Sequence, residues 1–189
     1  MMTNRQLLSL LIPLVIIVFS GCGSPPPEAP CQIDELLLKE SDLPGNNIFV
    51  SETPSIKGAP MRLGVERIGV AFGAPELFDG ANHQIYRMVD EDAAFKAYQD
   101  VEEEDFSTKD YLEEWNLIPE LSQIKTSASS QRMGCNLLIY TKAKECRLLA
   151  LYGPYLVRFS IRLHDLQYTD VTPLIQEIDS RMTECLLPK

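Results

Sequence analysis

The stretch that decides the fold is GCNLLIYTKAKECRLLALYGPYLVRFSIRL, residues 134–163. It contains three runs with strand composition, namely Cys135–Tyr140, Glu145–Tyr152 and Tyr155–Leu163. The connecting segments Thr141–Lys144 and Gly153-Pro154 are short and have turn composition. Strands joined by such short turns are antiparallel neighbours, so the stretch predicts the centre of an antiparallel sheet.

Side chains on these strands separate into two faces, because successive residues of a strand point to opposite sides. One face is a predicted core that helices should cover, made of Cys135, Leu137, Ile139, Cys146, Leu148, Ala150, Val157, Phe159 and Ile161. The other face mixes apolar side chains with three arginines: Leu138, Tyr140, Arg147, Leu149, Leu151, Arg158, Ser160 and Arg162.

The second face has two interpretations. Loops such as Asn46–Pro60 could cover it, with the arginines paired to acids at its rim. Alternatively it is a contact surface for an anionic or amphipathic ligand or partner, because a guanidinium pairs two-fold with carboxylate or phosphate. The residues that would form this ligand or partner face are Tyr140, Arg147, Arg158 and Arg162.

Two more strands are expected earlier in the chain. Gly64–Phe72 and Gln84–Asp90 alternate between apolar and polar residues, and the segment between them, Gly73–Asn82, is rich in turn residues. Asn46–Pro60 has no sustained period and predicts a loop with room for one edge strand.

Four helices are expected around these strands. The first covers Gln32–Glu40, and the second covers Glu91–Glu103 with Asp90 as its cap and Ala94, Phe95, Tyr98 and Val101 facing inward. The third starts at Ser107, and the last begins near Thr172-Pro173. The resulting fold class is α+β, an antiparallel sheet of about five strands with helices packed mainly on one face.

The chain opens with the layout of a bacterial export signal. Arg5 precedes an apolar run from Leu7 to Phe19, and small residues follow. A membrane-spanning helix needs about 20 apolar residues, which is more than this run provides. The sequence therefore predicts that residues 1–21 form a cleaved signal peptide.

The end of this signal, Phe19-Ser20-Gly21-Cys22, resembles the lipobox of bacterial lipoproteins, with Phe19 where that family usually has leucine. The resemblance implies that Cys22 is acylated, as with palmitate, and becomes the first residue of the mature protein. It places the protein outside the cytoplasm, lipid-anchored to the bacterial cell membrane, or to the outer membrane if the host has two. Residues 22–30 would then form a tether, which contains four prolines and favours an extended spacer.

Residues 31–189 have the length of one extracytoplasmic domain. The full chain has a formal net charge of −10, and losing the signal, whose only charged side chain is Arg5, brings it near −11. This acidity argues against nucleic acid as a partner. It is compatible with a domain that reaches the membrane only through its lipid.

Four cysteines remain when Cys22 is set aside: Cys31, Cys135, Cys146 and Cys185. In an exported domain they predict two disulfides, for which three pairings exist. A zinc site would show close C-x-x-C pairs, and the sequence has none. Because Cys135 and Cys146 flank a hairpin turn, we favour their pairing, which leaves Cys31 for Cys185.

Two further segments, LLKESDLPG at Leu37–Gly45 and DAAFKAY at Asp92–Tyr98, resemble small exported sensor-like domains. The family in question comprises the extracellular domains of actinobacterial receptor kinases and related lipoproteins. The resemblance implies a domain that senses a ligand or contacts a protein and is not an enzyme.

Motifs of known chemistry are missing from the sequence. It has no G-x-S-x-G, no phosphate-binding glycine loop and no H-E-x-x-H, and the acidic clusters Asp90–Asp92 and Glu102–Asp105 lack the glycine bend of a calcium loop. We therefore predict no catalytic residues, no metal and no cofactor. The leading hypothesis is a lipid-anchored binding or sensor-like domain for a small ligand or an envelope protein. The alternatives are an envelope enzyme such as a hydrolase with an unfamiliar site, and a structural or assembly lipoprotein.

Overall fold

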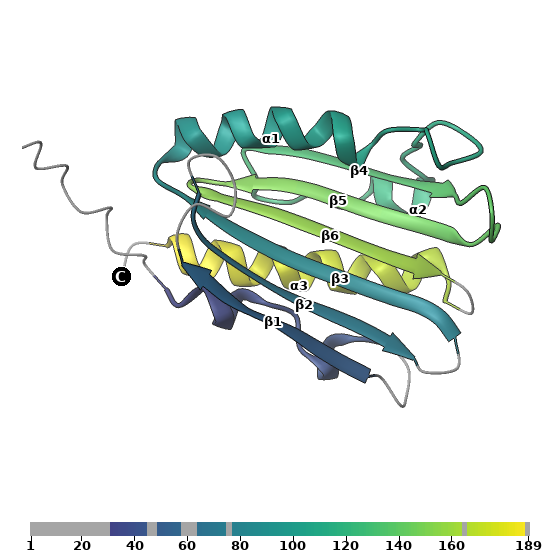
Figure 1. Cartoon of the computed structure of the whole chain (residues 1–189), viewed down its shortest axis with the longest axis horizontal. Helices are drawn as coiled ribbons and strands as arrows, with labels where there is room; N and C mark the ends of the chain where they lie inside the picture. Colours follow the sequence, from purple (N-terminus) through teal and green to yellow (C-terminus); the bar gives the residue numbers. More distant parts are fainter. Residues whose placement is uncertain (1–30, 45–48, 58–63, 75–76, 164–165, 188–189) are drawn as a thin grey trace, which may run out of the picture.

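A computed structural model describes residues 31–44, 49–57, 64–74, 77–163 and 166–187. Six strands form one antiparallel sheet in the order β1-β2-β3-β6-β5-β4 (Figure 1). Their bounds are β1 Phe49–Lys57, β2 Gly64–Ala74, β3 Leu77–Met88, β4 Ser130–Leu137, β5 Lys144–Tyr152 and β6 Tyr155–Leu163. The fold class is therefore the α+β class that the sequence predicts. All three late strands are present, but β4 begins five residues before the predicted run Cys135–Tyr140 and ends three residues before that run does.

The sheet gains its sixth strand from the region around Asn46–Pro60, where β1 pairs with β2 at one edge. The predicted turn at Gly73–Asn82 is wrong in extent, because most of it is strand. Phe72 lies opposite Ala81 and Gly73 lies opposite Gly80. Ladder hydrogen bonds with neighbouring strands outweigh the weak local preference of these residues for turns.

Helices cover the sheet on both sides, with most of them on one face. The long helix α3, Tyr168–Leu186, lies on that face together with the short elements η1 (Ile33–Leu36) and α2 (Pro119–Ser122) (Figure 1). Helix α1, Glu91–Asp105, lies on the opposite face and contacts β3, β5 and β6. A further short 3-10 turn, η2, covers Glu40–Asp42.

Each face has its own apolar core, as the alternation along β5 requires. Leu148 and Ala150 pack in the α3-side core, which also holds Val157, Phe159 and Ile161 from the predicted core face and Leu174, Ile175, Ile178 and Met182 from α3. Leu149 and Leu151 pack in the α1-side core with Ala94, Tyr98 and Val101. A strand buried on both faces explains the unbroken apolar run at residues 148–152.

Helix α1 starts as expected, since the Asp90 carboxylate accepts a hydrogen bond from the Ala93 N–H at 2.7 Å. The inward placement of Phe95 is wrong, because this side chain is 45% exposed. The buried stripe of α1 runs through Ala94, Ala97 and Val101. Phe95 lies one residue, or about 100° of helix rotation, away from this stripe.

The helix expected from Ser107 does not form. Residues 107–118 instead run beside β4, where the Leu112 N–H donates to the Leu137 carbonyl at 2.9 Å and Asn116 exchanges backbone hydrogen bonds with Cys135. The segment thus satisfies part of the outer edge of β4, which local capping signals could not anticipate. Its Trp115 is partly buried against the α1-side core.

Helix α3 begins about a turn earlier than expected. The Gln167 N–H donates to the Asp170 carboxylate at 2.7 Å, so a capping interaction starts the helix at Tyr168 and leaves Pro173 inside it. None of the described helices has the length and apolar character that a membrane span requires.

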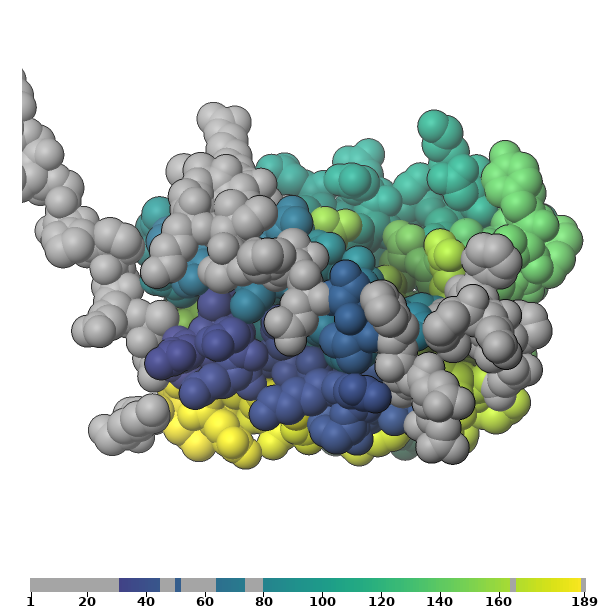
Figure 2. Space-filling view, turned by 60° about the horizontal axis from the view of Figure 1, so that its bottom comes forward, coloured from purple at the N-terminus to yellow at the C-terminus, as the bar shows by residue number. Residues whose placement is uncertain are grey.

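Two disulfides connect the pairs that the sequence favours. Cys31 is bonded to Cys185, with Cα atoms 5.6 Å apart, and Cys135 is bonded to Cys146 across β4 and β5, with Cα atoms 4.1 Å apart. The first bond fixes the start of the described domain to the end of α3. In Figure 2 the N-terminal segment accordingly lies against that helix, which is shown in yellow.

His83 on β3 also fixes the N-terminal segment. Its ring is fully buried, and Nδ1 accepts a hydrogen bond from the Leu38 N–H at 3.1 Å. Because Nδ1 accepts, the ring is neutral, with its proton on Nε2. Burial, and after it the positive charge of Arg181, lowers the pKa of His83 to about 3. The other histidine of the chain, His164, lies outside the described residues.

Candidate binding pocket at the end of helix α1

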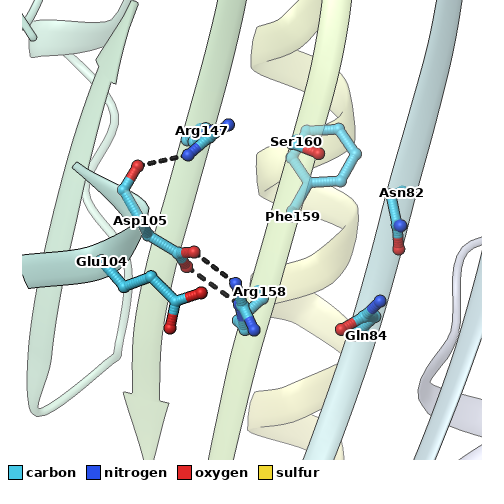
Figure 3. A pocket seen from close by; sticks show the side chains of 8 residues that line it. All are labelled: Asn82, Gln84, Glu104, Asp105, Arg147, Arg158, Phe159 and Ser160. Atoms are coloured by element: carbon cyan, nitrogen blue, oxygen red, sulfur yellow. Dashed lines mark hydrogen bonds and ion pairs between the residues drawn. The ribbon is translucent and has the colours of Figure 1, made fainter. Parts of the chain in front are cut away.

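The C-terminal end of α1 is fastened to the sheet by an ion pair. Arg158 on β6 donates from Nε to Asp105 Oδ2 at 2.9 Å and from Nη2 to the other carboxylate oxygen (Figure 3). Asp105 is the last residue of α1 and is largely buried. Burial by itself lowers the pKa of Arg158, but the hydrogen bonds and charge of Asp105 outweigh it and raise the pKa above its ordinary value. Arg158 is thus a fixed cation.

Arg147 on β5 holds the same helix end from a second side. Its Nη1 donates to the Asp105 backbone carbonyl (Figure 3), and its Nε donates to Glu145 Oε1 at 2.7 Å. The last carbonyls of a helix carry a partial negative charge, so a cation there is stabilising. The guanidinium also lies 4.8 Å from the ring centre of Trp115, a cation–π arrangement that connects segment 107–118 to the sheet.

Glu145 is the central acid of this network. It is 3% exposed, and its carboxylate also pairs with Arg162, with 3.3 Å between Oε2 and Nε. The Tyr111 hydroxyl donates to it at 3.1 Å. Burial, followed by the negative charge of Glu145, raises the pKa of Tyr111 to about 12, so the phenol keeps its proton and remains a donor. Removing one partner from a buried carboxylate of this kind would be destabilising, because it leaves a buried charge uncompensated.

Arg147 and Arg158, bound to Asp105, together form a clamp on the end of α1. A pocket of about 260 Å³ opens between this clamp and the neighbouring part of the sheet. Cross-strand pairing places Asn82 opposite Ser160 and Gln84 opposite Arg158. Figure 3 shows the Asn82 and Gln84 side chains on β3, beside the Arg158–Asp105 pair. The full lining comprises Asn82, Gln84, Glu104, Asp105, Arg147, Arg158, Phe159 and Ser160.

The four residues predicted to form a ligand or partner face are only partly brought together. Arg147 and Arg158 line the pocket, whereas Arg162 is exposed and joins them only through Glu145. Tyr140 is 87% exposed, in the β4–β5 connection, and is not among the pocket residues. The described cover over this face comes from α1 and segment 107–118. The described part of Asn46–Pro60 is the edge strand β1, which pairs with β2, and the rest of that segment lies outside the described residues.

Sequence reasoning missed several residues of the pocket. The sequence patterns place Asn82 in a predicted turn, and Asp105, in an acidic cluster, just beyond the predicted helix Glu91–Glu103. The alternation of Asn82 and Gln84 with buried Ala81, His83 and Ile85 is the signal that could have placed both polar residues on one strand face. Nothing in the sequence indicated that Asp105 meets Arg158, since the two residues are 53 positions apart.

The pocket contains hydrogen-bonding groups and no arrangement typical of covalent or metal chemistry. Its only hydroxyl side chain is Ser160, and its lining contains neither histidine nor cysteine. Within the described part of the chain, no group of three or more His, Cys, Asp or Glu side chains is arranged to hold a metal ion.

The fold of this protein is similar to that of a solved structure, although its sequence matches no family model and no curated protein. The structure is similar to the extracellular domain of PknH from Mycobacterium tuberculosis, with a TM-score of 0.58 and 7% sequence identity. The similarity covers 80% of this chain and 94% of the PknH chain. The fold is thus one that an extracellular domain uses, in line with the resemblance to exported sensor-like domains.

Proposed function

We propose that the protein is a lipid-anchored extracytoplasmic binding domain whose ligand occupies the pocket between α1 and strands β3 and β6. The observation that carries this proposal is the pocket itself, in which hydrogen-bonding side chains from α1, β3, β5 and β6 converge. Proteins bind small molecules in concave sites, where convergent polar groups fix the orientation of the ligand. The similarity of the fold to an extracellular domain supports a role outside the cytoplasm.

The anchor in this proposal is Cys22, which follows the apolar run of the export signal and lies outside the described residues. Eight residues, 23–30, separate it from Cys31, the first residue of the domain, so the two cysteines are nine residue steps apart. At about 3.1 Å per residue for an extended proline-rich chain, such a tether spans roughly 28 Å. The Cys31–Cys185 bond then links this tether covalently to the end of α3.

The clamp gives the pocket a fixed geometry. Arg158 and Arg147 are each held by at least two hydrogen bonds, so ligand binding would not have to order these long side chains. Side chains that are already immobilised cost less entropy on binding. This preorganisation supports a binding site over an incidental surface hollow.

Strand addition, the main route to assembly for a protein with an open sheet, is less favoured. One edge strand, β1, contains Pro54, which lacks an N–H, and its register shifts between Thr53 and Ile56. The other edge strand, β4, already forms bridges with residues of segment 107–118. Both features blunt sheet edges against pairing with another chain.

The test is capture from the native envelope. Full-length protein is purified with its anchor, and co-purifying small molecules and proteins are identified by mass spectrometry for the natural sequence and for Asn82→Trp. Asn82 is exposed at the pocket, so the larger ring fills the space without disturbing a core. Gln176→Trp, at an exposed position of α3, is the matched control.

We expect a molecule that accompanies the natural protein and the control variant but is lost from Asn82→Trp. Identical sets from all three proteins would contradict binding at this pocket. Recovery of the protein without membrane lipid on its N-terminal residue would contradict the anchor.

A further inference from the structure

The charges around the pocket balance. Its lining includes two cations, Arg147 and Arg158, and two acids, Glu104 and Asp105. Arg158 is already paired with Asp105, and Arg147 with the buried Glu145. An anionic ligand would have to compete with these carboxylates and approach Glu104, while a cationic ligand would face two guanidinium groups. Like-charge contacts of this kind penalise a charged ligand of either sign.

The pocket offers donors and acceptors side by side. Asn82 and Ser160, cross-strand partners, each carry a group that both donates and accepts. In the described part of the structure no other residue forms a hydrogen bond with either side chain. Gln84 Oε1 accepts from the Tyr86 hydroxyl at 2.7 Å, which orients the Gln84 amide and leaves its NH₂ group as a donor. Hydroxyl groups, which donate and accept at once, match this pattern.

The size and the lining of the pocket restrict the ligand further. A volume of about 260 Å³ is just below the range of small-molecule pockets, which hold roughly 300 Å³ or more, so only a small ligand fits. Phe159 is the only apolar lining residue, and its side chain is buried in the α3-side core. A ligand held mainly by apolar contact is therefore disfavoured.

We propose that this pocket binds a neutral, hydroxyl-rich ligand about the size of one sugar ring. The inference rests on the proposed function and narrows it from a binding pocket to one chemical class of ligand. Asn82, Gln84 and Ser160 form the hydrogen bonds to its hydroxyl groups, and the Arg158–Asp105 ion pair forms one wall of the pocket with no net charge.

Saturation-transfer NMR on the full-length protein, in a detergent without a sugar headgroup, tests this assignment. The probes are glucose and N-acetylglucosamine, with glucose 6-phosphate and glucosamine as anionic and cationic counterparts of the same ring. We expect transfer to both neutral sugars, and binding of both charged sugars about tenfold weaker or more, equivalent to about 1.4 kcal/mol. Asn82→Trp should abolish the transfer, and Gln176→Trp should leave it unchanged.

The outcomes separate this inference from the function on which it rests. Equal or tighter binding of a charged sugar, lost in Asn82→Trp, would overturn the ligand class and retain the binding pocket. Transfer that persists in Asn82→Trp, or no transfer to any probe, would overturn the sugar-like ligand. In those cases the envelope capture experiment still decides whether the pocket binds another molecule.

Discussion

Arg158 on β6 binds both carboxylate oxygens of Asp105, the last residue of α1. Together with Arg147, which donates to the Asp105 backbone carbonyl, this pair connects α1 to the centre of the sheet and forms one wall of the candidate pocket (Figure 3). The stability of the α1 side and the shape of the pocket therefore depend on the same residues.

The variant Asp105→Asn keeps the shape of this side chain and removes its charge. The partly buried Arg158 would lose its ion-pair partner, which we expect to lower the free energy of unfolding by about 1–3 kcal/mol. Urea unfolding followed by circular dichroism measures the change. Glu103→Gln, an exposed position on the same helix, should change stability by less than about 0.5 kcal/mol. Similar losses in the two variants would contradict a special role for Asp105.

His83 should make the protein sensitive to acid. Its pKa is about 3 in the folded protein and 6.5 in the unfolded chain, so below pH 6.5 only the unfolded state takes up the proton. The stability that the neutral His83 ring contributes is thus fully present above pH 6.5 and decreases as the pH falls toward 3. By pH 4 this titration should lower the free energy of unfolding by about 3 kcal/mol.

The variant His83→Asn tests this expectation, because asparagine can accept the Leu38 N–H and does not titrate. The variant should be less stable at neutral pH, yet its stability should fall less between pH 6.5 and 4 than that of the natural protein. Unfolding free energies measured across this range give the comparison. Parallel pH profiles for the two proteins would show that His83 does not titrate as described.

The two disulfides should contribute unequally. The Cys31–Cys185 bond joins residues 154 positions apart, and the Cys135–Cys146 bond joins residues 11 positions apart. Loop-closure entropy predicts about 5 kcal/mol of stabilisation for the first and about 3 kcal/mol for the second. The double alanine variants of each pair, compared by urea unfolding, should follow that order. The reverse order would mean that local packing at β4 and β5 dominates over chain entropy.

Cys22→Ala should abolish membrane attachment. The residue lies outside the described residues, and its role rests on the resemblance of residues 19–22 to a lipobox. In detergent phase separation the natural protein should enter the detergent phase, and the variant should remain uncleaved or enter the aqueous phase. A variant with the mature mass and partitioning of the natural protein would show that another group provides the anchor.

The sequence predicted the centre of the fold because strong, local signals dictate it. Residues 135–163 combine alternation, short turns and two cysteines that meet across adjacent strands. Segment 107–118 and the start of α3 were predicted less well, because long-range pairing with β4 and a capping contact at Gln167 decide them. Local propensity is weak compared with such tertiary contacts.

The site was only half predictable for the same reason. The excess of arginine on one strand face was visible in an acidic sequence, and Arg147 and Arg158 do line the pocket. Their partners were not visible, because Asp105 reaches them only after α1 packs across the sheet. The carboxylates change the expectation for the ligand, since paired arginines do not attract an anion as free ones would.

A crystal structure of the mature protein purified from its native envelope is the most direct test of the binding role. We predict a bound molecule in the pocket, within hydrogen-bonding distance of Gln84 and Ser160 and beside an intact Arg158–Asp105 pair. A molecule bound elsewhere on the domain, with only water between Asn82 and Arg158, would contradict it.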